Sequence, residues 1–174
     1  LFLFLTVETN DFFLQQGIHA TVDSSTSIAF TRFLVLAVVW TLYSLPLVWF
    51  GLQKKVSPVT QSGLIAMALG ACLALIRGIA FEPISLFALL LNSRALVLVL
   101  VTAAILLHGR WLKENRATYG WIDDVASVLR VAVVVLILVL VTAEARDYFQ
   151  KAIFLLEQGG DSSSSVGEIS NLQN

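Results

Sequence analysis

The sequence predicts an all-α, polytopic transmembrane helical bundle, and three observations lead to this fold class. Of the 174 residues, 57% are hydrophobic and only 13% are charged, whereas about 25% of the residues in a soluble domain are charged. The apolar residues form four long blocks, and about 20 such residues in a helix cross a bilayer. The blocks do not alternate apolar and polar residues, as the strands of a membrane barrel would.

The four blocks are predicted to be membrane-spanning helices with short connections. They cover residues 28–52, 62–81, 94–112 and 125–143. Polar loops at 53–61 and 113–124 join the first pair and the last pair. The connection at 83–92 is apolar but only about ten residues long, too short to span. We expect it to lie at the membrane interface or to dip back into the protein, where other helices cover it.

The boundaries of these segments give a domain organisation. We expect residues 1–13 to be the end of a preceding helix and residues 14–27 to be a linker. Residues 28–149 are the predicted four-helix transmembrane unit. Residues 150–174 are rich in Gly and Ser towards their end, which is typical of a mobile linker or tail.

The second predicted span carries a small residue at every fourth position, which places these residues on one helical face. They are Ala66, Gly70, Ala74 and Gly78. Small residues let another transmembrane helix approach closely, so this face is predicted to be a helix-packing seam. A ligand groove along the same face is the alternative interpretation.

A short motif occurs twice, each time after an apolar stretch. "TVETNDFF" begins at Thr6 and "TAEARDYF" begins at Thr142, an offset of 136 residues. Four predicted spans lie between the copies, and an even number of crossings returns the chain to the same side of the membrane. The repeat therefore predicts tandem four-helix units in a longer protein, of which this chain holds one unit and the end of the helix before it.

Three segments resemble a bacterial family of predicted multi-spanning membrane proteins, domain of unknown function 2339. "FTRFLVLAVVWTLYSLPLVWFGLQKKVSPVTQSGLIAMALGACLALI" resembles its recurring helix pair, "LLNSRALVLVLVTAAILL" its Asn-x-Arg helix start, and "LVTAEARDYF" its acidic helix end. The resemblance covers about residues 31–149, but Gln61 stands near the position where the family pattern has an arginine. It implies many helices and a bacterial inner membrane, and it implies no known activity or catalytic residue.

The charges divide between two predicted membrane faces. Face A is the side reached by the loops 53–61 and 113–124, and face B is the opposite side. The basic residues of face A are Lys54, Lys55, Arg110, Lys113 and Arg116, and those of face B are Arg32, Arg77, Arg94, Arg146 and Lys151. Because the two faces have equal numbers of basic residues, the positive-inside rule does not decide which face is cytoplasmic. Face A is favoured as cytoplasmic because its basic residues lie mostly in short loops.

The net charge of −1 excludes a basic surface for nucleic acid.

Face B gathers a candidate polar layer at four predicted helix ends. Its members are Arg32, Arg77, Arg94, Glu144 and Asp147. One interpretation is interfacial snorkelling with ion pairs that fix helix packing. A second is an anion site in which the arginines bind the phosphate of a lipid or of a lipid-linked glycan. A third is a proton or ion path. We expect Arg94 and Glu144 to belong to one network.

Two further polar residues lie within or at the end of predicted spans. Arg130 is an intramembrane charge one to two turns into the fourth span. It is expected to snorkel to face A or to pair with Asp123 or Asp124, and a functional charge within the bundle is the alternative. His108, at the end of the third span, is interpreted as an interfacial polar residue.

No motif predicts a catalytic residue, a cofactor or a metal site. The chain lacks a Gly-rich phosphate loop, a Gly-x-Ser-x-Gly elbow and a His-Glu-x-x-His motif. His19 has no ligand at metal-binding spacing, and the single cysteine, Cys72, lies within an apolar block.

The expected function is therefore that of a non-enzymatic membrane scaffold, or a component of envelope lipid or polysaccharide handling. Its expected partners are the lipid bilayer, other helices of the same longer protein, and an anionic lipid or lipid-linked glycan. A transporter is one alternative, which requires polar residues such as Thr41, Ser44 and Thr102 to line a mid-membrane cavity. A membrane transferase with catalytic residues outside this chain is the other. A scaffold predicts a filled bundle.

Overall fold

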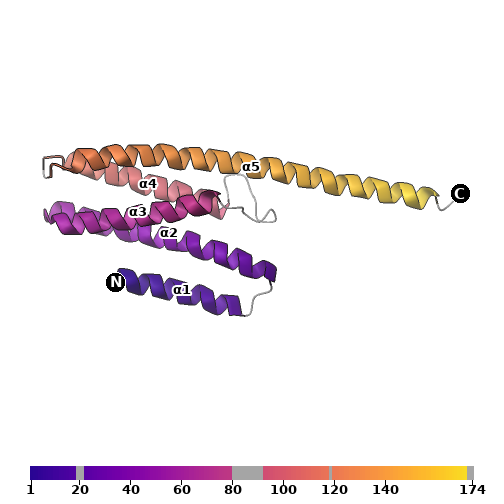
Figure 1. Ribbon diagram of the computed structural model, residues 1–174, viewed down its shortest axis with the longest axis horizontal. Coiled ribbons are helices and arrows are strands. Elements are labelled where there is room, and N and C mark those ends of the chain that lie inside the picture. Colours follow the sequence, from indigo (N-terminus) through magenta and orange to yellow (C-terminus); the bar gives the residue numbers. More distant parts are fainter. Residues whose placement is uncertain (19–21, 80–91, 118, 172–174) are drawn as a thin grey trace.

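The structure is a computed structural model that describes residues 1–18, 22–79, 92–117 and 119–171. These residues form five α-helices and no strand. The helices are α1 (Phe2–Ile18), α2 (Val22–Gln53), α3 (Ser57–Ile79), α4 (Ser93–Glu114) and α5 (Ile122–Asn171). They lie side by side along the long axis of the molecule, and α5 extends beyond the others at its C-terminal end (Figure 1). The predicted all-α fold class is confirmed.

Four of the helices are long and apolar enough to cross a membrane. The candidate spans are Ile28–Gln53, Ser57–Ile79, Ser93–Glu114 and Ile122–Ile153. Large apolar side chains also point outward from the bundle: Ile65 and Ile76 on α3 are 61% and 64% exposed, and Leu138 on α5 is 61% exposed. Such a surface is costly in water and favourable in hydrocarbon. The chain is therefore a membrane-embedded, multi-pass protein.

The helices are longer than the sequence patterns suggest. α1 continues to Ile18 and α2 already begins at Val22, so little of the predicted linker 14–27 lies between them. α5 continues to Asn171, where composition favours a coiled tail. Each glycine disfavours a helix by about 1 kcal/mol, whereas propagation of a helix that has already formed needs no new nucleus. Of the apolar connection 83–92, only Asn92 lies within the described residues.

The small residues of α3 lie where this helix meets its neighbours. Ala66, Gly70, Ala74 and Gly78 are all buried. A Cβ atom added at Gly70 would lie 3.0 Å from the carbonyl oxygen of Ala37 on α2. Gly70 therefore allows the backbones of α2 and α3 to approach closely, which is the packing role of a small-residue seam.

The turn between α2 and α3 is closed by backbone hydrogen bonds. The amide of Val56 donates to the carbonyl of Gly51 at 2.9 Å, and the amide of Lys55 donates to the carbonyl of Leu52 at 3.2 Å. These two bonds form a Schellman motif, which satisfies carbonyl groups at the end of α2. Lys55 adopts the left-handed conformation, with φ of 54°, at the position that usually holds glycine.

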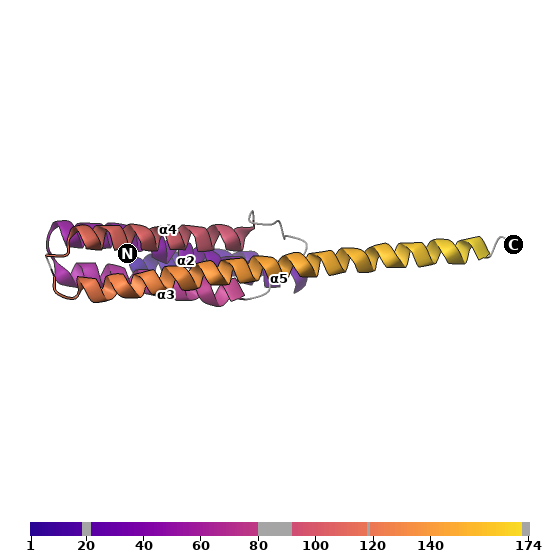
Figure 2. The same cartoon turned by 90° about the horizontal axis from the view of Figure 1, so that it is seen from above.

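The remaining helices complete the bundle around α2. The indole nitrogen of Trp40 donates to Thr6 Oγ1 on α1 at 3.0 Å, and the ring of Phe2 lies 5.4 Å from that of Trp40. α4 packs against α2, α3 and α5. Seen from above, α3 and α5 overlap while α4 lies beside them (Figure 2). The start of α4 and the middle of α5 thereby meet at face B.

Candidate functional site

The site at face B begins with the residue that caps α4. Asn92 has an extended backbone conformation, with φ of −90° and ψ of 160°, and its side-chain oxygen accepts a hydrogen bond from the amide of Ala95. The distance from Asn92 Oδ1 to that nitrogen is 2.7 Å. This is the usual geometry of an N-cap, which satisfies one of the four free amides at a helix start. The cap places Arg94 in the first turn of α4, facing α5.

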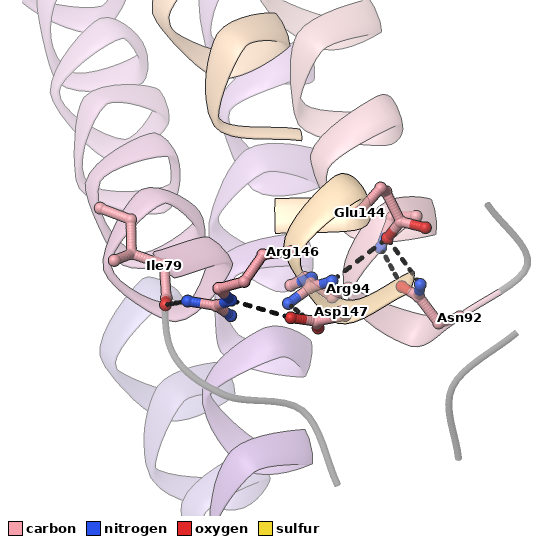
Figure 3. A network of polar contacts seen from close by, with 7 residues as sticks. Ile79, Asn92, Arg94, Glu144, Arg146 and Asp147 are labelled. Atoms are coloured by element: carbon pink, nitrogen blue, oxygen red, sulfur yellow. Dashed lines mark hydrogen bonds and ion pairs between the residues drawn. The ribbon is translucent and has the colours of Figure 1, made fainter. Parts of the chain in front are cut away.

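Arg94 is fully buried and contacts two carboxylates of α5. Its Nη2 atom lies 3.2 Å from Glu144 Oε1, and its Nη1 atom lies 2.8 Å from Asp147 Oδ2. Glu144 and Asp147 are three positions apart, so both face the same neighbour. Their side chains are only 6% exposed, and that of Arg94 is 0% exposed. The expected network between Arg94 and Glu144 is present in the structure (Figure 3).

Two more residues extend this network, so that it joins three helices. Asn92 Nδ2 donates to Glu144 Oε1 at 2.6 Å, which ties the cap of α4 to the same carboxylate. Arg146 Nε donates to Asp147 Oδ1 at 2.9 Å, and Arg146 Nη1 donates to the carbonyl oxygen of Ile79 at 3.0 Å. Ile79 is the last residue of α3, where carbonyl groups lack an intrahelical donor. We call Asn92, Arg94, Glu144, Arg146 and Asp147 the polar clamp.

The charges of the polar clamp balance. Arg94 and Arg146 contribute two positive charges, and Glu144 and Asp147 contribute two negative charges. Removing charged groups from water costs several kcal/mol for each ion unless partners of opposite charge compensate for it. Here both terminal nitrogens of Arg94 form ion pairs, one with Glu144 and one with Asp147. Arg94 is therefore not placed to bind an incoming anion, and the geometry suits the joining of α3, α4 and α5.

The other two arginines expected in this layer both contact one aromatic ring. The guanidinium carbons of Arg32 and Arg77 lie 4.7 Å and 3.9 Å from the centre of the Phe33 ring. Cations at this distance from an aromatic face are attracted by its quadrupole. The structure thus divides the five predicted layer residues into two groups, Arg94 with Glu144 and Asp147, and Arg32 with Arg77.

A small cavity lies beside the polar clamp, between α3 and α5. Its volume is about 190 Å³, and it is lined by Gly78, Ile79, Leu138, Val139, Thr142, Ala143 and Arg146. The lining is mostly apolar, and Arg146 is its only charged member. This cavity does not present the carboxylate or histidine cluster that a transferase reaction needs.

A second polar group lies in the interior of the bundle. Thr41, Ser44 and His108 are all fully buried. His108 Nδ1 lies 2.6 Å from the carbonyl oxygen of Ala104, and because a carbonyl only accepts, Nδ1 carries the proton. His108 Nε2 lies 3.3 Å from Ser44 Oγ, which also lies 2.6 Å from the carbonyl oxygen of Thr41.

His108 is therefore packed against neighbouring helices and does not face lipid or water, whereas its expected depth at the membrane interface stays a prediction. The sequence feature that indicates burial of His108 is its spacing along α4. Buried residues recur there every three or four positions: Leu98, Val101, Ile105, His108 and Leu112. In a helix that is apolar on all sides, this stripe does not stand out by hydrophobicity alone.

Arg130 is exposed and points towards the start of α5. Its Nε atom donates to the carbonyl oxygen of Ala126 at 3.3 Å, and Nη2 donates to Ser127 Oγ at 3.0 Å. Both acceptors lie one turn closer to face A, which is the direction that the expected snorkelling requires. Asp123 instead pairs with Arg116, at 2.6 Å.

The described residues contain no group of three His, Cys, Asp or Glu side chains that could hold a metal ion. The fold and the polar clamp together define the class of protein, a multi-pass helical membrane bundle whose buried charges join helices. Comparison with models of known protein families, with curated proteins and with solved structures finds no match.

Proposed function

We propose that the chain is a non-enzymatic scaffold unit of a multi-spanning protein of the bacterial inner membrane, in which it serves envelope lipid or polysaccharide handling. One observation carries the scaffold role: the charges at face B, of which only Arg146 is partly exposed, neutralise one another while they join three helices. Groups that perform transport or catalysis must meet a substrate. The carboxylates of the polar clamp meet an arginine of the same chain.

The interior polar residues also favour a packed unit over a transporter. A transport path requires polar side chains that line a cavity at mid-membrane. Thr41 and Ser44 are fully buried instead, and each lies at hydrogen-bonding distance from a backbone carbonyl of α2. Thr102 likewise donates to the carbonyl of Leu98 in its own helix. All three hydroxyls are thus used within the bundle.

The repeated motif supports a unit that joins others of its kind. Glu8 and Asp11 on α1 correspond in sequence to Glu144 and Asp147 on α5, and they have the same spacing. Both are exposed, whereas their counterparts are buried against Arg94. A helix that starts with Asn-x-Arg, like α4, would complete the same contact on α1. The resemblance to domain of unknown function 2339 favours such an array and a bacterial inner membrane.

Two alternatives have distinct requirements. A transporter-like protein would place its substrate path between repeats, at surfaces that a single unit does not enclose. A membrane transferase would take its catalytic residues from other parts of a longer protein. Both predict an activity that depends on charged residues, whereas a scaffold predicts none.

Reconstitution of the chain into vesicles, both alone and as two copies joined in tandem, tests this difference. Proton flux is followed with an internal pH-sensitive dye, and lipid movement is followed with a fluorescent lipid reduced from outside by dithionite. The scaffold role predicts both rates to equal those of protein-free vesicles. The matched variant carries Glu144→Gln and Asp147→Asn. Flux above the protein-free rate that this variant loses would contradict the proposal and favour a transporter.

A further inference from the structure

A groove opens between α4 and α5 at face A, at the opposite end of the bundle from the polar clamp. Its volume is about 810 Å³, within the range of about 300–1,000 Å³ that is typical of small-molecule sites. Apolar side chains of both helices line its floor, among them Ile105, Leu129 and Val133. Basic side chains line it as well: Arg110 and Lys113 from α4, and Arg130 from α5.

The charges around this groove do not balance. The lining includes four cations, Arg110, Lys113, Arg116 and Arg130, but only one carboxylate, Asp123. Asp123 pairs with Arg116.

Outside the lining, Glu114 pairs with Arg110 at 3.0 Å. Lys113 and Arg130 have no carboxylate partner among the residues that the structure describes; the hydrogen bonds of Arg130 go to a carbonyl and a hydroxyl of its own helix. The groove therefore keeps an excess of two positive charges.

The depth of Arg130 indicates what could balance this excess. Arg130 lies eight positions after Ile122, the first residue of α5, which is about 12 Å along the helix at 1.5 Å per residue. An arginine at this depth on an outer face is costly in hydrocarbon unless it reaches the interface or an anion. Lys113 lies in the last turn of α4, closer to face A. The two cations thus occupy different depths beside one apolar floor.

We propose that this groove binds an anionic phospholipid. The headgroup phosphate lies between Lys113 and Arg130, Arg110 adds charge at the rim, and an acyl chain follows the floor towards Ile105 and Val133. Guanidinium and ammonium groups form charge-assisted hydrogen bonds with phosphate, and the apolar floor is continuous with the lipid-facing surface. A zwitterionic lipid offers no net charge to match the excess. The inference requires only membrane insertion and does not depend on the scaffold role.

Native mass spectrometry of the full chain in detergent tests the proposal with phosphatidylglycerol and phosphatidylcholine as the probes. We expect one phosphatidylglycerol to be retained at concentrations where phosphatidylcholine is lost. Each surface cation contributes about 1 kcal/mol, or about fivefold, to the binding of anionic lipid. Lys113→Gln with Arg130→Gln should therefore weaken retention of phosphatidylglycerol by about 25-fold. Lys113→Gln with Arg130→Lys, which keeps one of the two charges, should retain phosphatidylglycerol about fivefold more strongly than the double glutamine variant.

The matched control is Lys54→Gln with Lys55→Gln, two exposed cations in the other loop of face A. This control should leave retention unchanged. Equal retention of phosphatidylcholine, or an equal loss in the control, would overturn the proposal. Displacement of the lipid by millimolar inorganic phosphate would also overturn it, since it would indicate an ion site that does not use the apolar floor. Melting of each variant in detergent checks that these exposed substitutions leave the bundle folded.

Discussion

Replacement of Arg94 by methionine should destabilise the bundle strongly, because it leaves two nearly buried carboxylates facing a single remaining cation. The lost contacts measure 3.2 Å to Glu144 and 2.8 Å to Asp147. At an effective dielectric constant of about 20, each charge pair at such a distance has a gross attraction of about 5 kcal/mol. Desolvation offsets much of that attraction, and removing one partner of a buried pair typically costs about 3–5 kcal/mol. We expect this range for Arg94→Met.

Glu144→Gln should cost less. Glutamine keeps an oxygen that accepts from Asn92 and Arg94 but removes the charge, and a hydrogen bond to a charged group contributes about 1.5–3 kcal/mol. When Arg94 is already absent, the same change removes an uncompensated carboxylate and should cost little or stabilise. The double-mutant cycle should therefore give a coupling energy of about 2 kcal/mol, within the usual range for contacting residues.

The assay is reversible unfolding in detergent by steric trapping, applied to both single variants and the double variant. The matched control is the pair Arg110 and Glu114, which has a similar separation of 3.0 Å but side chains 76% and 55% exposed. An exposed pair of this spacing should couple by at most about 0.5 kcal/mol. A coupling at Arg94 and Glu144 below about 0.6 kcal/mol, the average for hydrogen bonds between transmembrane helices, would refute a clamp role.

Three further predictions concern packing, the turn and the cap, each measured as unfolding free energy in the same detergent. Gly70→Ala should cost about 1–3 kcal/mol, because its Cβ would lie 3.0 Å from the backbone oxygen of Ala37. The control Gly109→Ala, whose Cβ would meet no atom within 4 Å, should be neutral or stabilise by up to about 1 kcal/mol. Equal losses of stability in the two variants would contradict the packing role of the seam. Lys55→Gly should stabilise by about 1 kcal/mol, because φ of 54° is strained for lysine; a loss of stability would count against the Schellman turn. Asn92→Ala should cost about 2–3 kcal/mol, from the lost cap and the lost donor to a buried carboxylate; a cost below about 0.5 kcal/mol would show that the cap is not needed.

The spans were readable from the sequence because length and apolar composition alone determine whether a helix can cross a bilayer. The predicted span 94–112 and the observed helix Ser93–Glu114 differ by one or two residues at each end. The contact between Arg94 and Glu144 was also predictable, since the sequence places both at the face-B ends of predicted spans. Helix ends were harder to predict from the sequence. For example, α5 continues into a segment whose glycines and serines favour a tail.

Apart from the small-residue seam of α3, the orientation of side chains within the bundle could not be predicted. Every face of these helices is apolar, so the periodicity that marks the inner face of a soluble helix is nearly absent. The sequence therefore does not reveal that His108 is fully buried between helices. Likewise, the sequence grouped Arg32 and Arg77 with Arg94 by membrane depth. The structure places them around Phe33 instead, because the angular position of each residue on its helix decides its contacts.

The pairing within the polar clamp depends on a contact between α4 and α5 that arises only on folding. Asn92 lies 52 positions from Glu144, and its dual role as cap and donor requires both helices to be in place. The groove at face A has the same origin, because its lining comes from two antiparallel helices and the residues that follow α4. Among the residues that line this groove, the sequence singles out only Arg130 as a charge within a predicted span.

The native thiol of Cys72 provides the most direct test that lipid is the solvent of this bundle. Cys72 is exposed on α3, seven positions before its last residue, Ile79, or about 10 Å along the helix. In lipid nanodiscs, a membrane-impermeant maleimide should leave Cys72 unlabelled and should label it after transfer to SDS. A cysteine placed at Lys54, in the loop, should react at once in the nanodisc. Labelling of Cys72 in the intact nanodisc as fast as at position 54 would show that water reaches the outer face of α3, and it would contradict the membrane-spanning fold.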